Sequence, residues 1–277
     1  SIPIYLMYGL FACLPVTTAS AFGGFIARSI GPLWGVSRRA EKNLEYIFPD
    51  LAPPLRRKII RQMWDNLGRT AAEAPHLKQL ALQKTTTVSG EQHLRAAKES
   101  GRPVIFLTAH TGNWELAAAF SALRLDTELS VIYRKPNNPF ADKLVRHIRR
   151  FSAHTLLMKG ADGWRGLLRA LRNGRSVGLL TDQKMTGGLT VDFLGKPALT
   201  AQAPATLALK TGAVLLPAYV IRKEDMCFCI AIEEPLTVHR DLSPEDQIRD
   251  LTQQMNDRLG AHIGQYPGQW LWLHRRW

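Results

Sequence analysis

The sequence is poor in cysteine and lacks the common motifs for nucleotide, metal and covalent chemistry. Its three cysteines (Cys13, Cys227 and Cys229) are too few and too unevenly spaced for a disulfide framework, which favours a reducing compartment. Neither Gly-x-Gly-x-x-Gly nor Gly-x-x-x-x-Gly-Lys-Ser/Thr occurs, which argues against a nucleotide cofactor. The absence of a Gly-x-Ser-x-Gly elbow argues against a serine hydrolase. Without His-Glu-x-x-His or paired Cys-x-x-Cys, we expect neither a metal nor a cofactor.

Charged residues are absent from the start of the sequence, where Arg28 is the first. An uncharged apolar stretch of this kind needs either a protein core or a bilayer around it. We therefore expect residues 1–35 to be a membrane anchor, formed by a short spanning helix or by a helix that lies in the membrane interface. The alternative is a helix buried in the globular domain.

Acidic residues are outnumbered along the whole chain. The 36 Lys and Arg against 23 Asp and Glu give a formal net charge of +13. Such a charge favours anionic partners, namely an acidic protein, a phosphorylated lipid, an anionic membrane face or nucleic acid. One interpretation is a binding protein without chemistry, acting on nucleic acid or membranes. Because the basic residues are dispersed and no recognisable nucleic-acid module is present, we expect no nucleic-acid partner.

Helical periodicity dominates residues 36–85, and an alternation of strands and helices follows over 86–277. The first region contains two expected helices, Arg38–Phe48 and Arg56–Ala74. The second has the alternation typical of an α/β domain with a mixed central sheet flanked by helices. Its strands are expected at Thr86–Val88, Val104–Thr108, Glu128–Tyr133, Val177–Leu180, Ala213–Val220 and Cys227–Ile232. Its helices are expected at Gly90–Glu99, Glu115–Leu123, Pro139–Phe151, Gly163–Asn173, Ala203–Thr211 and Ser243–Ile263.

A histidine, His110, lies in the turn between an expected buried strand and an expected helix. Turns at the carboxyl ends of strands line the ligand crevice of open α/β sheets. Glu115 follows five residues later and could hold the imidazole in one tautomer, as the carboxylate of a catalytic dyad does. Since the chain has no Gly-x-Ser-x-Gly elbow to supply a nucleophile, such a dyad would activate a hydroxyl of the substrate for direct acyl transfer. The alternative is a histidine and a glutamate with no shared role.

The sequence around this histidine resembles a known family. The motif His-Thr-Gly-Asn-Trp-Glu at 110–115 is similar to the His-x-x-x-x-Asp/Glu motif of glycerolipid-type acyltransferases. The longer AHTGNWELAA resembles the lipid A late acyltransferases, which add secondary lauroyl or myristoyl chains. The segments VGLLTDQK (177–184), 187–220 and PGQWLWLHRRW (267–277) resemble the same family, as do RRAEKNLEYIFPDL and GRTAAEAP. The resemblance covers nearly the whole chain and implies a glycerolipid-acyltransferase-like α/β fold.

The resemblance also implies roles for individual residues. His110 would be the general base, and Glu115 would hold its ring. Arg149 would stabilise the oxyanion that develops on a thioester carbonyl, with Arg146 and Arg150 as alternatives. Gly112 would shape the turn. The remaining expected site residues, which would shape the turn or line the substrate site, are Asn113, Arg134, Asp182 and Gln183.

Donor, acceptor and location follow from the same resemblance. The donor would be a thioester of the acidic acyl carrier protein, with acyl-CoA as the alternative. The acceptor would be a phosphorylated lipid A precursor, or another glycolipid such as a phosphatidylinositol mannoside. The protein would lie at the cytoplasmic face of a Gram-negative inner membrane. The sequence departs from the family at Lys184, where Asp-Gln-Asp is common, and members usually open with a longer anchor.

Overall fold

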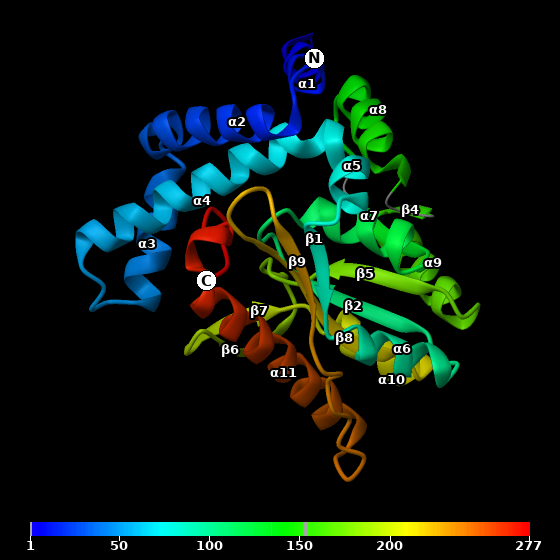
Figure 1. Cartoon of the computed structure of the whole chain (residues 1–277). Helices are drawn as coiled ribbons and strands as arrows, with labels where there is room; N and C mark the ends of the chain where they lie inside the picture. The colour runs from blue at the N-terminus through cyan, green and yellow to red at the C-terminus, as the bar shows by residue number, and fades with distance from the viewer. Residues whose placement is uncertain (1, 134, 152–154) are drawn as a thin grey trace.

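A seven-stranded sheet lies at the centre of the protein (Figure 1). The computed structural model describes residues 2–133, 135–151 and 155–277. The strand order is β1-β9-β8-β2-β5-β3-β4, in which β8 and β9 are antiparallel and the other neighbours are parallel. The expected mixed α/β sheet flanked by helices is therefore confirmed. The strands are β1 Thr86–Ser89, β2 Val104–Thr108, β3 Leu129–Tyr133, β4 Thr155–Met158, β5 Ser176–Leu180, β8 Val214–Arg222 and β9 Phe228–Ile232.

The six strands expected from the sequence are all present, and three more were not expected. One is the short edge strand β4. The other two are β6 (Leu189–Phe193) and β7 (Lys196–Thr200), which form a separate antiparallel hairpin. The turn of this hairpin places Leu194 and Gly195 at positive φ, which suits the right-handed twist of the two strands.

Helices cover both faces of the sheet, so its strands are apolar on both sides. In β2, Val104 and Phe106 pack into the core beneath α5 (Leu77–Leu82), α6 (Glu91–Glu99) and α7 (Trp114–Arg124). The alternate residues Ile105 and Leu107 pack into the opposite core. That second core is covered by α9 (Ala161–Arg172), α10 (Ala203–Thr211) and α11 (Pro244–Gln265). Helices therefore cover β2 on both faces of the sheet, and its carboxyl end lies between these two helical layers.

The N-terminal helices form an additional layer against the α/β sheet. These are α1 (Ile2–Cys13), α2 (Val16–Ile30), α3 (Ser37–Ile47) and α4 (Pro53–Glu73). Helix α2 lies along α4 (Figure 1). They approach closely at Gly23 and Gly68, because a Cβ on Gly68 would lie 2.2 Å from the Gly23 oxygen. The approach leaves no room for a side chain at that crossing.

The expected spanning form of the N-terminal anchor has no counterpart in the part of the chain that the structure describes. No helix there is both long enough and apolar enough to cross a bilayer. Helix α1 has 12 residues and α2 has 15, whereas about 20 apolar residues are needed. Several large apolar side chains of α1 and α2 are nevertheless exposed to solvent.

The C-terminal segment packs beside the end of β2. After α11, the 3₁₀ turn η4 (Pro267–Gln269) leads into residues 270–277, which lie against α3 and α4. Trp270 and Trp272 are fully buried there, and Trp270 forms a β-bridge with Thr111. This contact brings the end of the chain to the turn after β2.

Candidate active site

The turn at residues 109–113, called here the base turn, carries His110 between β2 and α7. In the pairing of β2 with β5, Thr108 is opposite Leu180. The residues two positions further on, His110 and Asp182, consequently lie side by side. Nδ1 of His110 is 2.9 Å from Oδ1 of Asp182, and the main-chain N–H of His110 donates to Oδ2 at 3.0 Å. The carboxylate thus fixes the imidazole with Nδ1 protonated and leaves Nε2 to accept a proton.

Asp182 is fully buried and accepts a further hydrogen bond from the C-terminal segment. The indole Nε1 of Trp270 donates to Oδ2 at 3.0 Å. Nε2 of His274 is 3.6 Å from the same oxygen, too far for a hydrogen bond, and its ring centroid lies 4.8 Å from that of His110. The base turn, the turn that follows β5 and the C-terminal segment therefore meet at one carboxylate.

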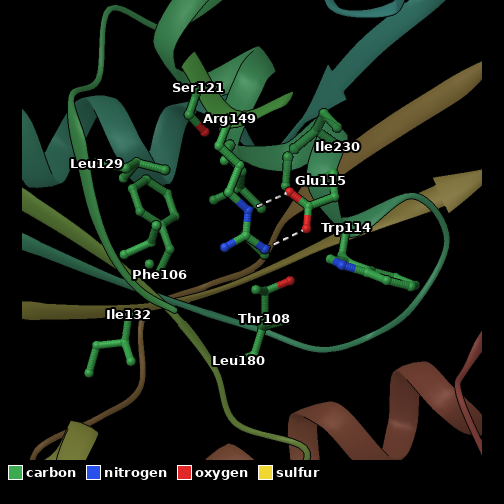
Figure 2. Close-up of a pocket in the computed structure, with 16 residues that line it drawn as sticks. Phe106, Thr108, Trp114, Glu115, Ser121, Leu129, Ile132, Arg149, Leu180 and Ile230 are labelled. Atoms are coloured by element: carbon green, nitrogen blue, oxygen red, sulfur yellow. Dashed lines mark hydrogen bonds and ion pairs between the residues drawn. The ribbon is translucent and has the colours of Figure 1, made fainter. Parts of the chain in front are cut away.

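Glu115, the partner expected to hold the ring of His110, has a different contact in the structure, where Asp182 bonds to that ring. Glu115 instead forms a bidentate ion pair with Arg149, with Nε and Nη2 of the guanidinium at 2.9 and 2.5 Å from its oxygens (Figure 2). The cause is position: Glu115 lies in the first turn of α7 and faces Arg149 in η3 (Arg149–Phe151), while Nδ1 of His110 is already bonded to Asp182. The two carboxylates thus have separate partners.

The electrostatics of the pair favour a charged imidazole. Burial alone would lower the pKa of His110, but the attraction and hydrogen bond of Asp182, with a smaller contribution from Glu115, outweigh it and raise that pKa above 6.5. Burial alone would raise the pKa of Asp182, but His110 and, more weakly, His274 hold it well below its usual value. A base of this kind is stabilised in the protonated form that it reaches during a reaction.

An apolar cavity opens beside the base turn, between α7 and the sheet (Figure 2). Trp114 lines it, and the Trp114 ring centroid is 5.2 Å from that of His110. The ion pair of Glu115 with Arg149 also lines it, as does Thr108, whose buried hydroxyl has no hydrogen-bond partner among the described residues. The apolar part of the lining comes from α7 and the strands: Phe106, Ala117, Ala118, Leu129, Val131, Ile132, Gly178, Leu180, Ala218, Ile230 and Ile232.

The other expected site residues lie in different surroundings. Arg146 pairs with Asp142, and Arg150 donates to the main chain of His147, so Arg149 is the arginine of the three that lines the cavity. Gln183 is exposed, and Arg134 lies outside the described residues. Asn113 is fully buried and caps α7 by accepting from the N–H of Leu116, so its contacts are those of a turn residue.

Three side chains at this site could together reach a metal ion. The ligand atoms of His110, Asp182 and His274 lie within 4.8 Å of one another. In the present arrangement the oxygens of Asp182 accept hydrogen bonds from the ring and main chain of His110 and from Trp270. These hydrogen bonds orient the imidazole of His110, and they give no separate support to a metal site.

The sequence analysis did not identify Trp270 and His274 as site residues. Both belong to PGQWLWLHRRW, a segment that carries the family resemblance but has no motif of chemical meaning. Burial lowers the pKa of His274 to about 4, so this second imidazole is neutral near pH 7. Its position beside Asp182 could be found only from the packing of the C-terminal segment against the base turn.

These features define an α/β protein with a histidine–aspartate pair at the carboxyl edge of its sheet and an apolar cavity beside it. The chain belongs to the bacterial lipid A biosynthesis acyltransferase family, whose family model matches residues 4–277. The expected family membership is therefore confirmed.

Individual relatives differ in the lipid that their names give. The chain is 28% identical to a phosphatidylinositol mannoside acyltransferase of Mycobacterium tuberculosis over 204 residues, which are 72% of this chain and 62% of the relative. It is 26% identical to a lipid A biosynthesis palmitoleoyltransferase of Escherichia coli over 243 residues, 86% of this chain and 77% of the relative. It is 27% identical to a lipid A biosynthesis lauroyltransferase of Escherichia coli over 251 residues, 87% of this chain and 79% of the relative. The match thus spans less than two thirds of the mycobacterial protein.

Proposed function

We propose that the protein is an O-acyltransferase that moves a fatty acyl chain from a thioester to a hydroxyl of a membrane glycolipid. The observation that carries this proposal is the His110–Asp182 pair beside an apolar cavity. A general base next to a cavity lined mainly by apolar side chains suits a reaction in which an alcohol attacks an acyl carbonyl while the acyl chain lies in the cavity.

In the proposed reaction, Nε2 of His110 takes the proton of the acceptor hydroxyl. The hydroxyl oxygen attacks the carbonyl carbon of the thioester at the same time. The new C–O bond forms, the C–S bond breaks, and the leaving thiolate receives the proton from the imidazolium. Asp182 stabilises the imidazolium that exists between these two transfers. No acyl group is attached to the protein at any stage.

Arg149 is proposed to stabilise the negative charge on the thioester oxygen. Glu115 holds its guanidinium at the cavity by two hydrogen bonds, and bidentate pairing fixes the plane of an arginine as well as its position. Glu115 then acts through Arg149, which differs from the role expected from the sequence. Arg134, Asn113 and Gln183 remain proposed contributors to the substrate site.

The donor is proposed to be an acyl thioester of acyl carrier protein, with acyl-CoA as the alternative. The formal net charge of +13 favours an acidic partner, because complementary charge speeds encounter and orients docking. The acceptor is proposed to be a phosphorylated lipid A precursor. A phosphatidylinositol mannoside is the second candidate, and the name of the mycobacterial relative favours it.

Association with a membrane surface is proposed to occur through α1 and α2. Helix α2 buries Ala19 and Gly23 on the side of α4 and leaves large apolar side chains outside. A surface with so many exposed large apolar side chains is unusual in a soluble protein and suits a helix lying in the membrane interface. The cytoplasmic face of an inner membrane is the proposed location. The exposed side chains are Ile4, Tyr5, Leu6, Met7, Leu10, Phe22, Phe25, Ile26, Ile30, Leu33 and Trp34.

The proposal is tested with purified protein and defined substrates. Lauroyl-carrier protein and lauroyl-CoA are each combined with a lipid A precursor or a phosphatidylinositol mannoside, and the lipids are analysed by mass spectrometry. We expect one acceptor to gain a single acyl chain with the parent protein and not with His110→Ala. Stoichiometric acylation of the protein itself by donor alone would refute direct transfer, and the absence of any acylated lipid in all four combinations would refute the function. Lipid A from a strain without the gene identifies the acceptor in the cell.

A further inference from the structure

One face of α4 holds the base turn. Asn66, Thr70 and Glu73 are spaced four and three residues apart, so their side chains leave the helix on the same side. The amide of Asn66 and the hydroxyl of Thr70 both donate to the main-chain oxygen of Gly112, at 2.9 and 3.1 Å. Gly112 has φ +54, and a Cβ there would lie 2.0 Å from the oxygen of Val220. The conformation of the turn therefore requires glycine at position 112, and α4 is bonded to the turn there.

Glu73, the last residue of α4, is fully buried beside this turn. One carboxylate oxygen accepts from Nδ2 of Asn113 at 2.7 Å, and the other accepts from the hydroxyl of Ser20 at 2.6 Å. Arg222, in β8, pairs with both oxygens, and its Nε donates to Asn66 at 2.8 Å. The network thus joins α2, α4 and β8 and ends on the base turn.

The buried carboxylate of Glu73 is better explained by the orientation that it gives to the Asn113 amide than by a contribution to the stability of the core. A buried carboxylate is costly unless it is paired and its lone pairs are used, and replacing such a pair by apolar side chains often leaves stability unchanged. Here the carboxylate fixes one end of the Asn113 amide, while Oδ1 at its other end accepts from the N–H of Leu116 and caps α7. The amide of Asn113 is therefore held at both ends, three residues after His110.

We infer that Glu73 is a positioning residue: by holding Asn113 it fixes the base turn so that the ring of His110 stays against Asp182. The kinetic consequence of this inference rests on the proposed acyl transfer. Its structural consequence, the orientation of the imidazole, can be measured without any substrate.

The test reverses the direction of one hydrogen bond. In Glu73→Gln, one carboxylate oxygen becomes an NH₂ group, which faces a donor of Arg222 in either orientation and also faces either Asn113 or Ser20. In Asn113→Asp, two carboxylates face each other. In the double variant, the introduced glutamine donates to the introduced aspartate, and the glutamine oxygen still accepts from Ser20 and from Nη1 of Arg222, while the bond from Nη2 of Arg222 is lost. The bond is thus restored with its direction reversed and the net charge unchanged. Asn113→Ser removes the bond while keeping a residue that caps helices well.

Two measurements are made on each variant in the full chain. The first is the titration of the His110 ring by NMR, with His110→Gln used for assignment. We expect its pKa to fall toward 6.5 in Glu73→Gln and in Asn113→Ser, and to return to the parent value in the double variant, whose net charge equals that of the parent. The second is acyl transfer, where we expect kcat to fall on the order of 10²-fold with little change in KM for the donor, because a misplaced base slows the chemical step. The double variant should recover most of kcat.

A matched control separates positioning from packing. Ser20→Ala removes another hydrogen bond to the same carboxylate without touching the base turn, and it should leave both the His110 titration and kcat near the parent values. The inference is overturned if Ser20→Ala lowers kcat as much as Glu73→Gln does, or if the double variant is no better than the single ones. It is also overturned if Asn113→Ser is folded and has the same His110 pKa and the same kcat as the parent. If the parent itself transfers no acyl group, the proposed function fails, while the titrations still decide the role of Glu73.

Discussion

Asp182 is the residue on which the proposed chemistry depends most directly. It receives N–H groups from the main chain and ring of His110 and from the indole of Trp270, and it has no exposed surface. Removing its charge removes the main reason for the raised pKa of His110. The same change withdraws the counter-charge that stabilises the imidazolium.

The pH dependence of kcat/KM should report this interaction. His110 accepts a proton only when it is neutral, so activity should rise with pH through a midpoint above 6.5 in the parent protein. In Asp182→Asn the midpoint should move to lower pH, because the carboxylate no longer favours the charged ring. At the optimum, kcat should fall on the order of 10²–10⁴-fold.

Glu115→Gln provides the comparison for this experiment. Glu115 influences His110 through space, whereas Asp182 is bonded to the ring, so the midpoint should move less in Glu115→Gln than in Asp182→Asn. A rising limb at the same pH in Asp182→Asn and the parent would show that His110 is not the titrating base.

At the scale of elements, α7 and the sheet enclose the cavity proposed to receive the acyl chain. Ala118, on α7, faces that space. In Ala118→Leu the added carbons should occupy the cavity and shift the preferred donor to a shorter chain, while the helix is preserved because leucine is a good helix former. The measurement is kcat/KM for a series of acyl donors of increasing length.

The same substitution at Ala122 is the control for cavity filling. Ala122 lies one turn further along α7 and is not among the residues that line the cavity. Ala122→Leu should keep the chain-length preference of the parent. An unchanged preference in Ala118→Leu would mean that the acyl chain lies elsewhere.

Most elements of the α/β sheet could be predicted from the sequence because their signals are local. The runs at β2 and β8 are apolar and rich in strand-forming residues, and the intervening segments have helical composition. Strand β4 was missed because it is a half-buried edge strand of four residues without a distinctive pattern. The β6–β7 hairpin was missed because Gly195 and Pro197 interrupt its apolar pattern, although both fit at its turn and start.

The partner of His110 could not be predicted from local spacing. Glu115 is five residues away, yet Asp182, 72 residues away, holds the ring, because β5 pairs beside β2 and sets Thr108 against Leu180. Strand adjacency of this kind depends on the tertiary fold. The same is true of Glu73, whose contact with Asn113 follows from the position of α4 against the base turn.

The molecule as a whole should lose stability in mild acid. His262 is buried against the ring of Tyr219, and burial lowers its pKa to about 4. The unfolded chain, with an ordinary pKa of 6.5, binds the proton first, so the free energy of unfolding should fall as pH decreases from 6.5 toward 4. His262 alone should account for about 2 kcal/mol of this loss near pH 5.

Urea unfolding at a series of pH values measures this contribution. In His262→Gln the slope of the unfolding free energy against pH should become shallower over the same window. It should not vanish, because the pKa of His274 is also lowered to about 4 by burial. Equal slopes in the variant and the parent would contradict a buried neutral His262.

Membrane association should depend on the apolar surface of α1 and α2 and resist salt. Phe25 has 55% of its surface exposed, and Leu55, on α4, has 44%. Burial of apolar groups is not screened by ions, so the parent should stay on anionic vesicles at about 1 M salt, where the Debye length is about 3 Å. Phe25→Asp should come off in a flotation assay under these conditions, and Leu55→Asp should not. Release of the parent by salt alone would show that it binds the vesicles through charge and not through the apolar surface of α1 and α2.

The site is assembled from parts that the ribosome makes at widely separated times. His110 is synthesised first, Asp182 follows 72 residues later, and Trp270 comes another 88 residues after that. In the proposed reaction, a thioester that meets the growing chain meets no oriented imidazole before the carboxylate of Asp182, and the indole that donates to it, have been made. The proposed activity should appear only when residues 270–277 pack under α4, so a chain that stalls or is cut before Trp270 should neither transfer acyl groups nor waste acyl donor on a misplaced base.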